Sequence, residues 1–299
     1  MGPTAVGKSW LALALARRLG NAEILSVDSM QVYRGMDIGT AKPTAAERAQ
    51  VQHHLIDLID PHETMDIVDF ARAHDSAMAD MHQRSRQAVL AGGTGLYIRA
   101  VVDRLEPPPR YPEVMARLEN EPDTVGLHHR LRQVDPTAAA RMEPNNRRRV
   151  LRALEVSLGS GRPFSSFGPG MTHYPPVPHL ILGVDAPRDV LDRRIDVRYD
   201  QQMRQGLLAE VEGLLNSSEV MSHTARQALG YKELAEHLEG AISLDEALDT
   251  AKRRTRRFAR RQQRWFRRDP RIVWLEHQSS PEPLEEVAWE LVERHLDHK

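Results

Sequence analysis

Eight residues near the amino terminus have the types and spacing of a phosphate-binding loop. The stretch GPTAVGKS fits the pattern Gly-x-x-x-x-Gly-Lys-[Ser/Thr], in which successive backbone N–H groups surround the oxygens of a diphosphate. In this pattern the lysine neutralises phosphate charge, and the Ser or Thr hydroxyl is a ligand for Mg²⁺. We therefore predict a diphosphate and Mg²⁺ site formed by Gly2, Pro3, Thr4, Ala5, Val6, Gly7, Lys8 and Ser9.

Two further polar residues follow apolar stretches, as ligand-binding residues follow strands. Asp28 comes directly after AEILSV, and Thr94 comes directly after QAVLAGG. Because ligands of parallel sheets bind at the carboxyl ends of the strands, we expect both residues beside the phosphate-binding loop. Asp28 could bind Mg²⁺ through water, act as a general base, or cap a turn. Thr94 could instead cap the helix that follows it.

The order of apolar stretches predicts the elements that hold these residues. Short apolar runs alternate with helical periodicity along most of the chain, which is typical of a parallel sheet with helices on both faces. We predict an α/β fold like that of P-loop NTPases, with an inserted all-helical domain. The expected strands are residues 22–27, 53–60, 87–93, 179–185 and 271–276. The expected helices of the α/β part are residues 10–20, 70–86, 95–103, 188–215 and 252–268.

A proline-rich stretch and a stretch rich in glycine, proline and serine mark the borders of the insertion. LEPPPRYP leaves the α/β core and LGSGRPFSSFGPGMTHYPPVPH returns to it, with only helical stretches between them. We assign residues 1–106 and 179–299 to the core and residues 107–178 to the insertion.

The phosphate-binding loop lacks the strand that normally comes before it, because only Met1 precedes Gly2. Neighbouring strands would keep unpaired backbone groups if that strand were absent. We therefore expect the natural start to lie upstream and Met1 to be the last residue of the strand.

Composition and charge exclude several classes of function. The chain has 299 residues, a formal net charge of −1 and no cysteine. The lack of cysteine excludes disulfides, zinc–thiolate sites and a cysteine nucleophile, and it fits a cytoplasmic protein. No long apolar run and no signal-like amino terminus occur, so we expect neither a membrane span nor secretion.

The basic residues are concentrated in one stretch. Residues 252–268 contain ten basic residues and no acidic residue. On a helix, one face of this stretch would pack against the core through Ala251, Thr255, Phe258, Gln262 and Trp265. The opposite face would present Arg253, Arg257, Arg260, Arg264 and Arg268. We expect this arginine row to bind a polyanion.

Longer stretches of the sequence resemble one enzyme family. SVDSMQVYRGMDIGTAKP, HHLIDLIDP, AGGTGLY, NNRRRVLRALEV and ALGYKE follow one another as in tRNA dimethylallyltransferases, also called tRNA isopentenyltransferases. The resemblance extends from Gly2 to about Leu275. It implies transfer of a dimethylallyl group from dimethylallyl diphosphate to the exocyclic amine of the adenosine 3′-adjacent to the anticodon. The implied substrates are tRNAs that read codons beginning with U.

The resemblance implies chemical roles for residues in this sequence. Lys8, Ser9 and Mg²⁺ would stabilise the departing diphosphate, and Asp28 would accept the proton of the adenine amine. Arg194 and Arg198 match family arginines near the diphosphate, although both could instead be surface charges of a helix.

The resemblance also implies residues that bind the anticodon stem-loop of tRNA. Thr94 matches a family position that contacts the target nucleotide, and Met115 stands where many relatives carry an arginine. The implied tRNA contacts are Asp28, Ser29, Met30, Gln31, Thr94, Met115, Arg148, Arg149, Val150, Leu151, Arg152, Gln227, Ala228, Leu229, Gly230, Tyr231 and Lys232. We expect a monomer, because one tRNA must reach both parts of one chain.

Three other functions remain open from the sequence. Small-molecule and nucleotide kinases commonly contain such a loop, but in a kinase the basic stretches would have no function. A nucleotide-switched RNA-binding protein would leave Asp28 and Thr94 without a role. An adenylate isopentenyltransferase would prenylate free nucleotides, and those relatives lack so extensive an insertion.

Overall fold

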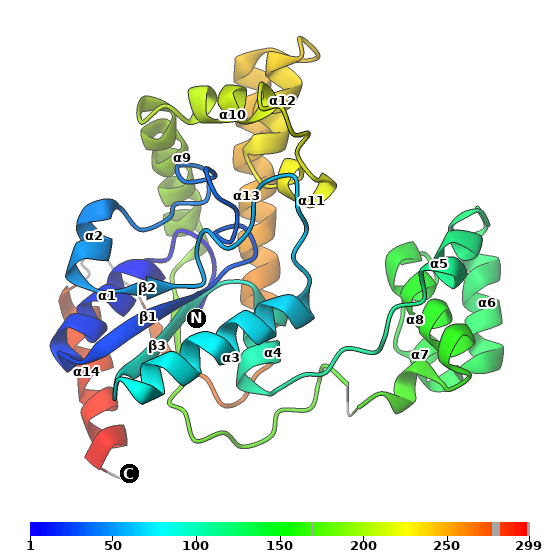
Figure 1. The fold of residues 1–299 in the computed structure, drawn as a ribbon, viewed down its shortest axis with the longest axis horizontal. Coiled ribbons are helices and arrows are strands. Elements are labelled where there is room, and N and C mark those ends of the chain that lie inside the picture. The colour runs from blue at the N-terminus through cyan, green and yellow to red at the C-terminus, as the bar shows by residue number, and fades with distance from the viewer. Residues whose placement is uncertain (169, 277–281, 298–299) are drawn as a thin grey trace. The chain divides into compact units, whose positions relative to one another are not determined.

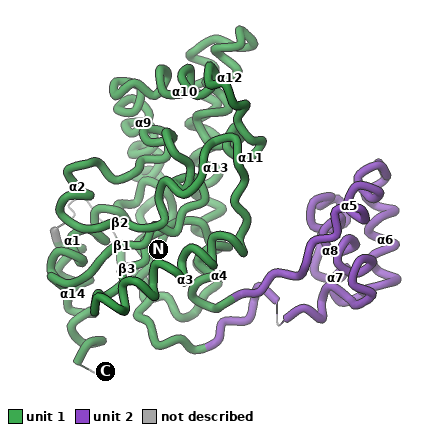
Figure 2. The backbone as a smooth tube through the Cα atoms, viewed as in Figure 1, with its two compact units in different colours: residues 1–104, 176–299 green, residues 105–175 purple. Residues whose placement is uncertain are grey.

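The structure is a computed structural model (Figure 1), and it describes residues 1–168, 170–276 and 282–297. The chain forms two compact units (Figure 2): residues 1–104 with 176–299, and residues 105–175. The second unit lies within two or three residues of the insertion predicted at 107–178. No helix in the described part of the chain is long and apolar enough to cross a membrane.

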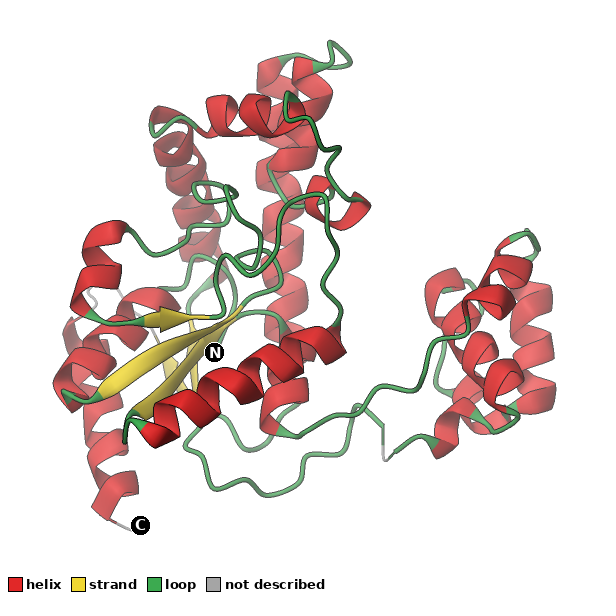
Figure 3. Ribbon diagram, in the orientation of Figure 1, coloured by secondary structure: helices red, strands yellow, loops and turns green. Residues whose placement is uncertain are grey.

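The first unit is built on parallel strands with helices around them (Figure 3). β1 (Ala22–Val27) lies between β2 (His53–His54) and β3 (Gln87–Gly92). A second sheet pairs β4 (Leu182–Asp185) with β5 (Val273–Glu276), and every pairing is parallel. The α/β prediction is therefore confirmed.

The alternation of side chains along β1 explains why helices cover both faces of its sheet. All six residues of β1 are buried. Ile24 packs in a cluster with residues of α1 (Lys8–Leu19), and Leu25 packs in a cluster with Phe70 of α3 (Ile67–Gln83). Since successive strand side chains point to opposite faces, these helices lie on opposite sides of the sheet. α4 (Gly95–Val102) follows β3 and packs against α3.

Several predicted elements of the first unit are wrong in extent. The helix expected at 252–268 begins earlier, as α13 (Leu244–Phe266). The strand expected at 53–60 ends at His54, because Leu55 and Asp57 have positive φ angles of 63° and 56° and turn the chain. The helix expected at 188–215 is two helices, α9 (Arg188–Arg204) and α10 (Leu207–Leu215). They are separated at Gly206, whose φ of 100° is incompatible with a continuous helix.

The amino terminus lies beside β4. The Met1 ammonium donates a hydrogen bond to the Leu182 carbonyl at 2.6 Å, and the Met1 carbonyl accepts one from the Val184 N–H at 2.8 Å. In the described residues, β1 is the only strand paired with β3. The single continuous sheet that we expected is thus two sheets, with Met1 hydrogen-bonded to one of them.

The carboxyl-terminal part of the first unit is mostly helical, with β5 between its last two helices. After α10 come α11 (His223–Arg226), α12 (Tyr231–Leu238), α13 (Leu244–Phe266) and α14 (Glu282–Asp297). The remaining helix described in this unit, α2 (Ala45–Gln50), lies between β1 and β2 in the chain. α14 was not predicted. It packs against α1, where Arg18 pairs with Glu286 at 2.8 Å and lies 4.6 Å from the centre of the Trp289 ring.

The packing face of α13 is rotated from the predicted one. Ala259 and Phe266 are buried where Phe258 and Trp265 were expected, and Arg260 is half-buried. The small side chain of Ala259 lets α13 approach its neighbours more closely than the large side chain of Phe258 would. The buried row of α13 is Ala247, Ala251, Thr255, Ala259, Gln262 and Phe266.

The second unit is a small helical bundle, as predicted. It contains α5 (Pro112–Glu119), α6 (Thr124–Val134), α7 (Pro136–Ala140), α8 (Arg147–Ser160) and the short 3-10 helix η1 (Phe164–Ser166). Asp135 accepts hydrogen bonds from the N–H groups of Ala138 and Ser165, so it caps α7 and fixes η1 beside it. The core of the bundle includes Leu118, Leu127, Leu131, Val150 and Leu154.

Candidate active site

The phosphate-binding loop has the backbone that its sequence pattern predicts. Gly7, which directly precedes α1, has a φ of 98°, and Ala5 also has a positive φ of 63°. A Cβ atom on Gly2 would lie 2.2 Å from the Val184 carbonyl oxygen, so only glycine fits there. Since the loop leads into the amino-terminal end of α1, its N–H groups and the helix dipole favour an anion.

Lys8 extends along the loop. Its ammonium donates a hydrogen bond to the Pro3 carbonyl at 2.5 Å. The Lys8 pKa is lowered to about 8, mainly by burial; the Asp28 carboxylate partly opposes this shift, and the nearby Arg198 adds to it. A buried cation with a lowered pKa is a favourable partner for a polyanionic ligand, because the ligand charge replaces the lost hydration.

A cavity of about 210 Å³ lies beside the loop. It brings together Lys8 and Ser9 from the loop, Asp28 after β1, and Arg198 from α9. Gly92 and Gly93 at the end of β3 line it as well. The carboxyl ends of β1 and β3 therefore meet the phosphate-binding loop in one cavity. Asp28 lines this cavity, whereas Thr94 is not among its lining residues.

Arg198 and Arg194 lie one turn apart on α9 but differ in environment. The Arg198 guanidinium donates a hydrogen bond to the Thr4 hydroxyl at 2.7 Å, and its buried Nε has no hydrogen-bond partner among the described residues. Burial lowers the Arg198 pKa. A guanidinium aimed at the loop with a donor to spare can bind phosphate oxygens. Arg194 is half-buried and does not line the cavity.

Asp28 and Thr94 are held close together by backbone groups. One Asp28 carboxylate oxygen accepts a hydrogen bond from the Met30 N–H at 2.8 Å. The Thr94 hydroxyl accepts one from the Ser29 N–H at 3.1 Å. Thr94 precedes α4, but its side chain makes no capping hydrogen bond, so the alternative capping role is wrong. Its hydroxyl instead fixes the turn that contains Asp28 and Ser29.

Gln31 connects this turn to another wall of the cavity. It accepts a hydrogen bond from the Ser26 hydroxyl at 2.6 Å and donates to the carbonyls of Thr40 and Ala41, both at 3.1 Å. Gln31, Thr40 and Ala41 all line the cavity. Met30 is half-buried and packs against the core.

The segment at residues 227–232, which was predicted to contact tRNA, stabilises residues 37–39, next to Thr40 and Ala41 of the cavity lining. The Tyr231 hydroxyl donates to Glu210 at 2.5 Å, and Glu210 also accepts hydrogen bonds from the N–H groups of Asp37, Ile38 and Gly39. Of the six residues, Ala228, Gly230 and Tyr231 are buried, whereas Gln227, Leu229 and Lys232 are half-buried. The last three are the members of this segment that can reach a ligand with their side chains.

In the second unit, the predicted tRNA contacts divide into exposed and buried residues. Arg148 and Arg149 are exposed on α8. Val150 and Leu151 lie in the hydrophobic core of the bundle, so we correct their assignment from nucleic-acid contact to packing.

The remaining predicted contacts of this unit also have structural partners. Arg152 donates to the Pro108 carbonyl at 2.6 Å and pairs with Glu155 at 2.6 Å, which fixes the chain that enters the unit. Met115 is half-buried against the same core. Sequence resemblance identified the segment, but helix packing decides which side chains are accessible.

The donor groups of the cavity fit Mg²⁺. The Ser9 hydroxyl and the Asp28 carboxylate line the same cavity, and both are oxygen donors of the kind that Mg²⁺ prefers. Within the described ranges, no group of three or more His, Cys, Asp or Glu side chains could hold a metal ion.

Gln262 was not recognised as a site residue from the sequence. Gln262 was assigned to the packing face of α13, but its amide bonds to the phosphate-binding loop and to the end of β3. It accepts from the Thr4 N–H and donates to the Gly93 carbonyl, each at 2.8 Å. These partners are 258 and 169 residues away in the chain, so no local sequence pattern could have indicated them.

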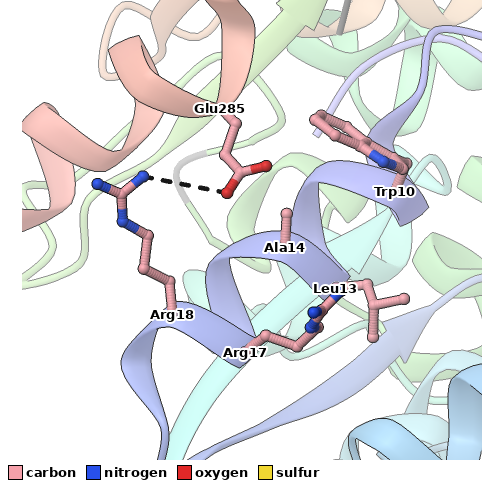
Figure 4. A pocket seen from close by; sticks show the side chains of 6 residues that line it. All are labelled: Trp10, Leu13, Ala14, Arg17, Arg18 and Glu285. Atoms are coloured by element: carbon pink, nitrogen blue, oxygen red, sulfur yellow. Dashed lines mark ion pairs between the residues drawn. The ribbon is translucent and has the colours of Figure 1, made fainter. Parts of the chain in front are cut away.

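A second hollow lies on the surface between α1 and α14 (Figure 4). Its volume is about 520 Å³, and Trp10, Arg17 and Glu285 are among its lining residues. Trp10, which is 38% exposed, lines this hollow and the smaller cavity as well. None of the predicted site residues lines the larger hollow.

Comparison with known families and proteins gives a consistent result. Residues 31–269 match the model of the IPP transferase family. The tRNA dimethylallyltransferase of Geobacter metallireducens is 46% identical over 92% of this chain and 91% of its own. That of Thermobifida fusca is 45% identical over 99% of this chain and 94% of its own.

Solved structures are similar to this chain over at least 92% of its length. The tRNA isopentenylpyrophosphate transferase of Bacillus halodurans is 39% identical, with a TM-score of 0.72, over 100% of this chain and 97% of its own. A eukaryotic dimethylallyltransferase acting on tRNA is 26% identical, with a TM-score of 0.76, over 92% of this chain and 72% of its own.

Proposed function

The chain belongs to the IPP transferase family, and we propose that it transfers a dimethylallyl group from dimethylallyl diphosphate to tRNA. The acceptor is the exocyclic amine of the adenosine 3′-adjacent to the anticodon, in tRNAs that read codons beginning with U. The observation that carries this proposal is the single cavity that joins the diphosphate loop to Asp28. Curated relatives with the name tRNA dimethylallyltransferase cover nearly the whole chain.

The donor side of the cavity suits a prenyl diphosphate. The loop N–H groups, the Lys8 ammonium and the Arg198 guanidinium can share the charge that develops on the diphosphate as it leaves. Mg²⁺, bound by the diphosphate and the Ser9 hydroxyl, would supply further charge stabilisation. These groups would make the diphosphate a better leaving group without forming a covalent intermediate.

The acceptor side of the cavity suits a weak nitrogen nucleophile. The amine nitrogen would form a bond to the allylic carbon as the bond from that carbon to the diphosphate oxygen breaks. Asp28 would accept the amine proton, and the product would be prenylated adenosine plus diphosphate. Thr94 fixes the Asp28 turn through the Ser29 N–H, which would keep the carboxylate in place for an in-line reaction.

Both units carry surfaces for a tRNA anticodon stem-loop. The second unit exposes Arg148 and Arg149, and α13 exposes Arg253, Arg257 and Arg264. Arginines bind phosphates and stack on unpaired bases, so both surfaces suit an RNA loop whose target base is turned outward. We further propose that the enzyme acts as a monomer in the cytoplasm.

A labelling experiment tests this function. The protein is incubated with Mg²⁺ and labelled dimethylallyl diphosphate, with bulk tRNA or AMP as acceptor, and parallel reactions contain labelled ATP. We expect label to pass from the prenyl donor to tRNA in the wild type and not in Lys8→Met. Transfer to AMP but not to tRNA would indicate an adenylate isopentenyltransferase, and transfer from ATP would indicate a kinase.

A further inference from the structure

The side chain of Gln262 connects the two sides of the cavity. It extends from α13 and is buried, with 7% exposed. Its Oε1 accepts the Thr4 N–H of the phosphate-binding loop, and its Nε2 donates to the Gly93 carbonyl, each at 2.8 Å. Gly93 directly precedes Thr94. One amide is thus bonded to the donor-binding loop and to the turn on the acceptor side.

The fit around this amide is close. A Cβ atom on Gly93 would lie 2.5 Å from the Gln262 Nε2, and the next atom that it would approach is the Gly2 carbonyl oxygen at 3.5 Å. The amide can satisfy both partners in only one orientation, because the loop offers a donor and the turn offers an acceptor. A methionine at this position would fill similar space but form neither hydrogen bond.

The two hydrogen-bond partners of Gln262 belong to segments that position residues needed for the reaction. The Thr4 hydroxyl accepts a hydrogen bond from Arg198 at 2.7 Å. On the other side, the Thr94 hydroxyl accepts from the Ser29 N–H, next to Asp28. A chain of bonded groups therefore extends from the diphosphate arginine to the candidate base, and Gln262 is its central member.

We propose that Gln262 is a positioning residue for prenyl transfer. It fixes the separation between the diphosphate loop and the turn that holds Thr94 and Asp28, so that donor and acceptor meet in line. The inference rests on the proposed function, since it concerns the geometry of the same reaction. Gln262 contributes neither a proton nor a charge, and its effect acts through the groups that it bonds.

Kinetics of Gln262→Met test the role, with Gln263→Met as the matched control. The control removes a hydrogen bond of the same helix to Asp185, at 2.7 Å, and neither of these two residues lines the cavity. We expect kcat of Gln262→Met to fall by about 10- to 100-fold, the scale of a misplaced reacting group. Its KM for tRNA should stay within about twofold, because the arginine surfaces are unchanged. A kcat within about threefold of wild type would overturn the role. An equally large loss in Gln263→Met would also overturn it.

Gly93→Ala tests the same contact without changing Gln262. The added methyl group would displace the amide, since it meets the Gln262 Nε2 before any other atom. We expect a similar fall in kcat, and the double variant Gly93→Ala with Gln262→Met should be no slower than the slower single variant. Losses that multiply in the double variant would contradict a shared contact.

The activity of the wild type distinguishes this role from the proposed function. If the wild type and the variants transfer label equally well, only the proposed role of Gln262 is wrong. If the wild type transfers none, the proposed function and this role both fail.

Discussion

Binding of the prenyl donor should take up a proton through Lys8. Burial lowers the Lys8 pKa from 10.5 to about 8 in the free protein. A bound diphosphate places negative charge beside the ammonium and raises this pKa again. Donor binding therefore converts the neutral fraction of Lys8 to the charged form, and each conversion removes one proton from the buffer.

The size of this effect follows from the pKa of free Lys8. The neutral fraction, and with it the proton uptake per donor bound, should be roughly 0.1 at pH 7, roughly 0.5 at pH 8 and roughly 0.9 at pH 9. Donor affinity should fall about tenfold from pH 7 to pH 9, because the neutral form must first be protonated. The phosphate oxygens of the donor are ionised throughout this range, since a second phosphate pKa is about 6.

Isothermal titration in buffers of different ionisation enthalpy measures the uptake directly. The observed binding enthalpy should depend on the buffer at pH 8, with a slope that gives the number of protons. Lys8→Arg is the control, because a guanidinium stays charged over this range and should abolish both the uptake and the pH dependence. A wild-type enthalpy independent of buffer at pH 8, with an unchanged affinity up to pH 9, would refute the reasoning.

The remaining predictions concern catalysis, tRNA binding and stability. Asp28→Ala should reduce kcat by about 100-fold or more, as expected for loss of a general base, and leave the tRNA dissociation constant nearly unchanged; equal losses in both would exclude that role. Changing Arg253, Arg257 and Arg264 together to Gln should weaken tRNA binding and reduce the slope of log affinity against log salt by about 2, whereas an unchanged slope would place these arginines outside the interface. Glu155→Ala should lower the free energy of unfolding of the helical unit by about 3 kcal/mol, measured by urea unfolding. The reason is that the Tyr111 N–H and Arg152 lose their buried partner. A decrease below about 1 kcal/mol would contradict this prediction.

Local patterns predicted the parts of the site that depend on local backbone. The phosphate-binding loop and β1 occur where the sequence places them, because glycine spacing and an apolar run determine these elements over a few residues. The insertion was recognised from its proline-rich borders and its helical periodicity.

Long-range contacts explain what the sequence did not predict. The strand at 53–60 is cut short partly because Asp57 pairs with the buried Lys42, 15 residues away. The packing face of α13 was misplaced because the small Ala259, rather than the large Phe258, faces the core.

Resemblance to a family likewise identifies segments rather than side-chain directions. It marked residues 148–152 as one group, but α8 buries Val150 and Leu151 and exposes Arg148 and Arg149. The hydrogen bonds of Gln262 join three distant segments, and they become visible only when the fold is complete.

Mapping of the modified nucleotide tests the central claim most directly. A tRNA that reads a codon beginning with U is incubated with the protein, Mg²⁺ and dimethylallyl diphosphate, then digested with ribonuclease and analysed by mass spectrometry. One five-carbon prenyl unit should appear on the adenosine 3′-adjacent to the anticodon, and with Asp28→Ala it should form at least about 100-fold more slowly. An unmodified anticodon loop after incubation with the wild-type protein, or a prenyl unit on another nucleotide, would contradict the account.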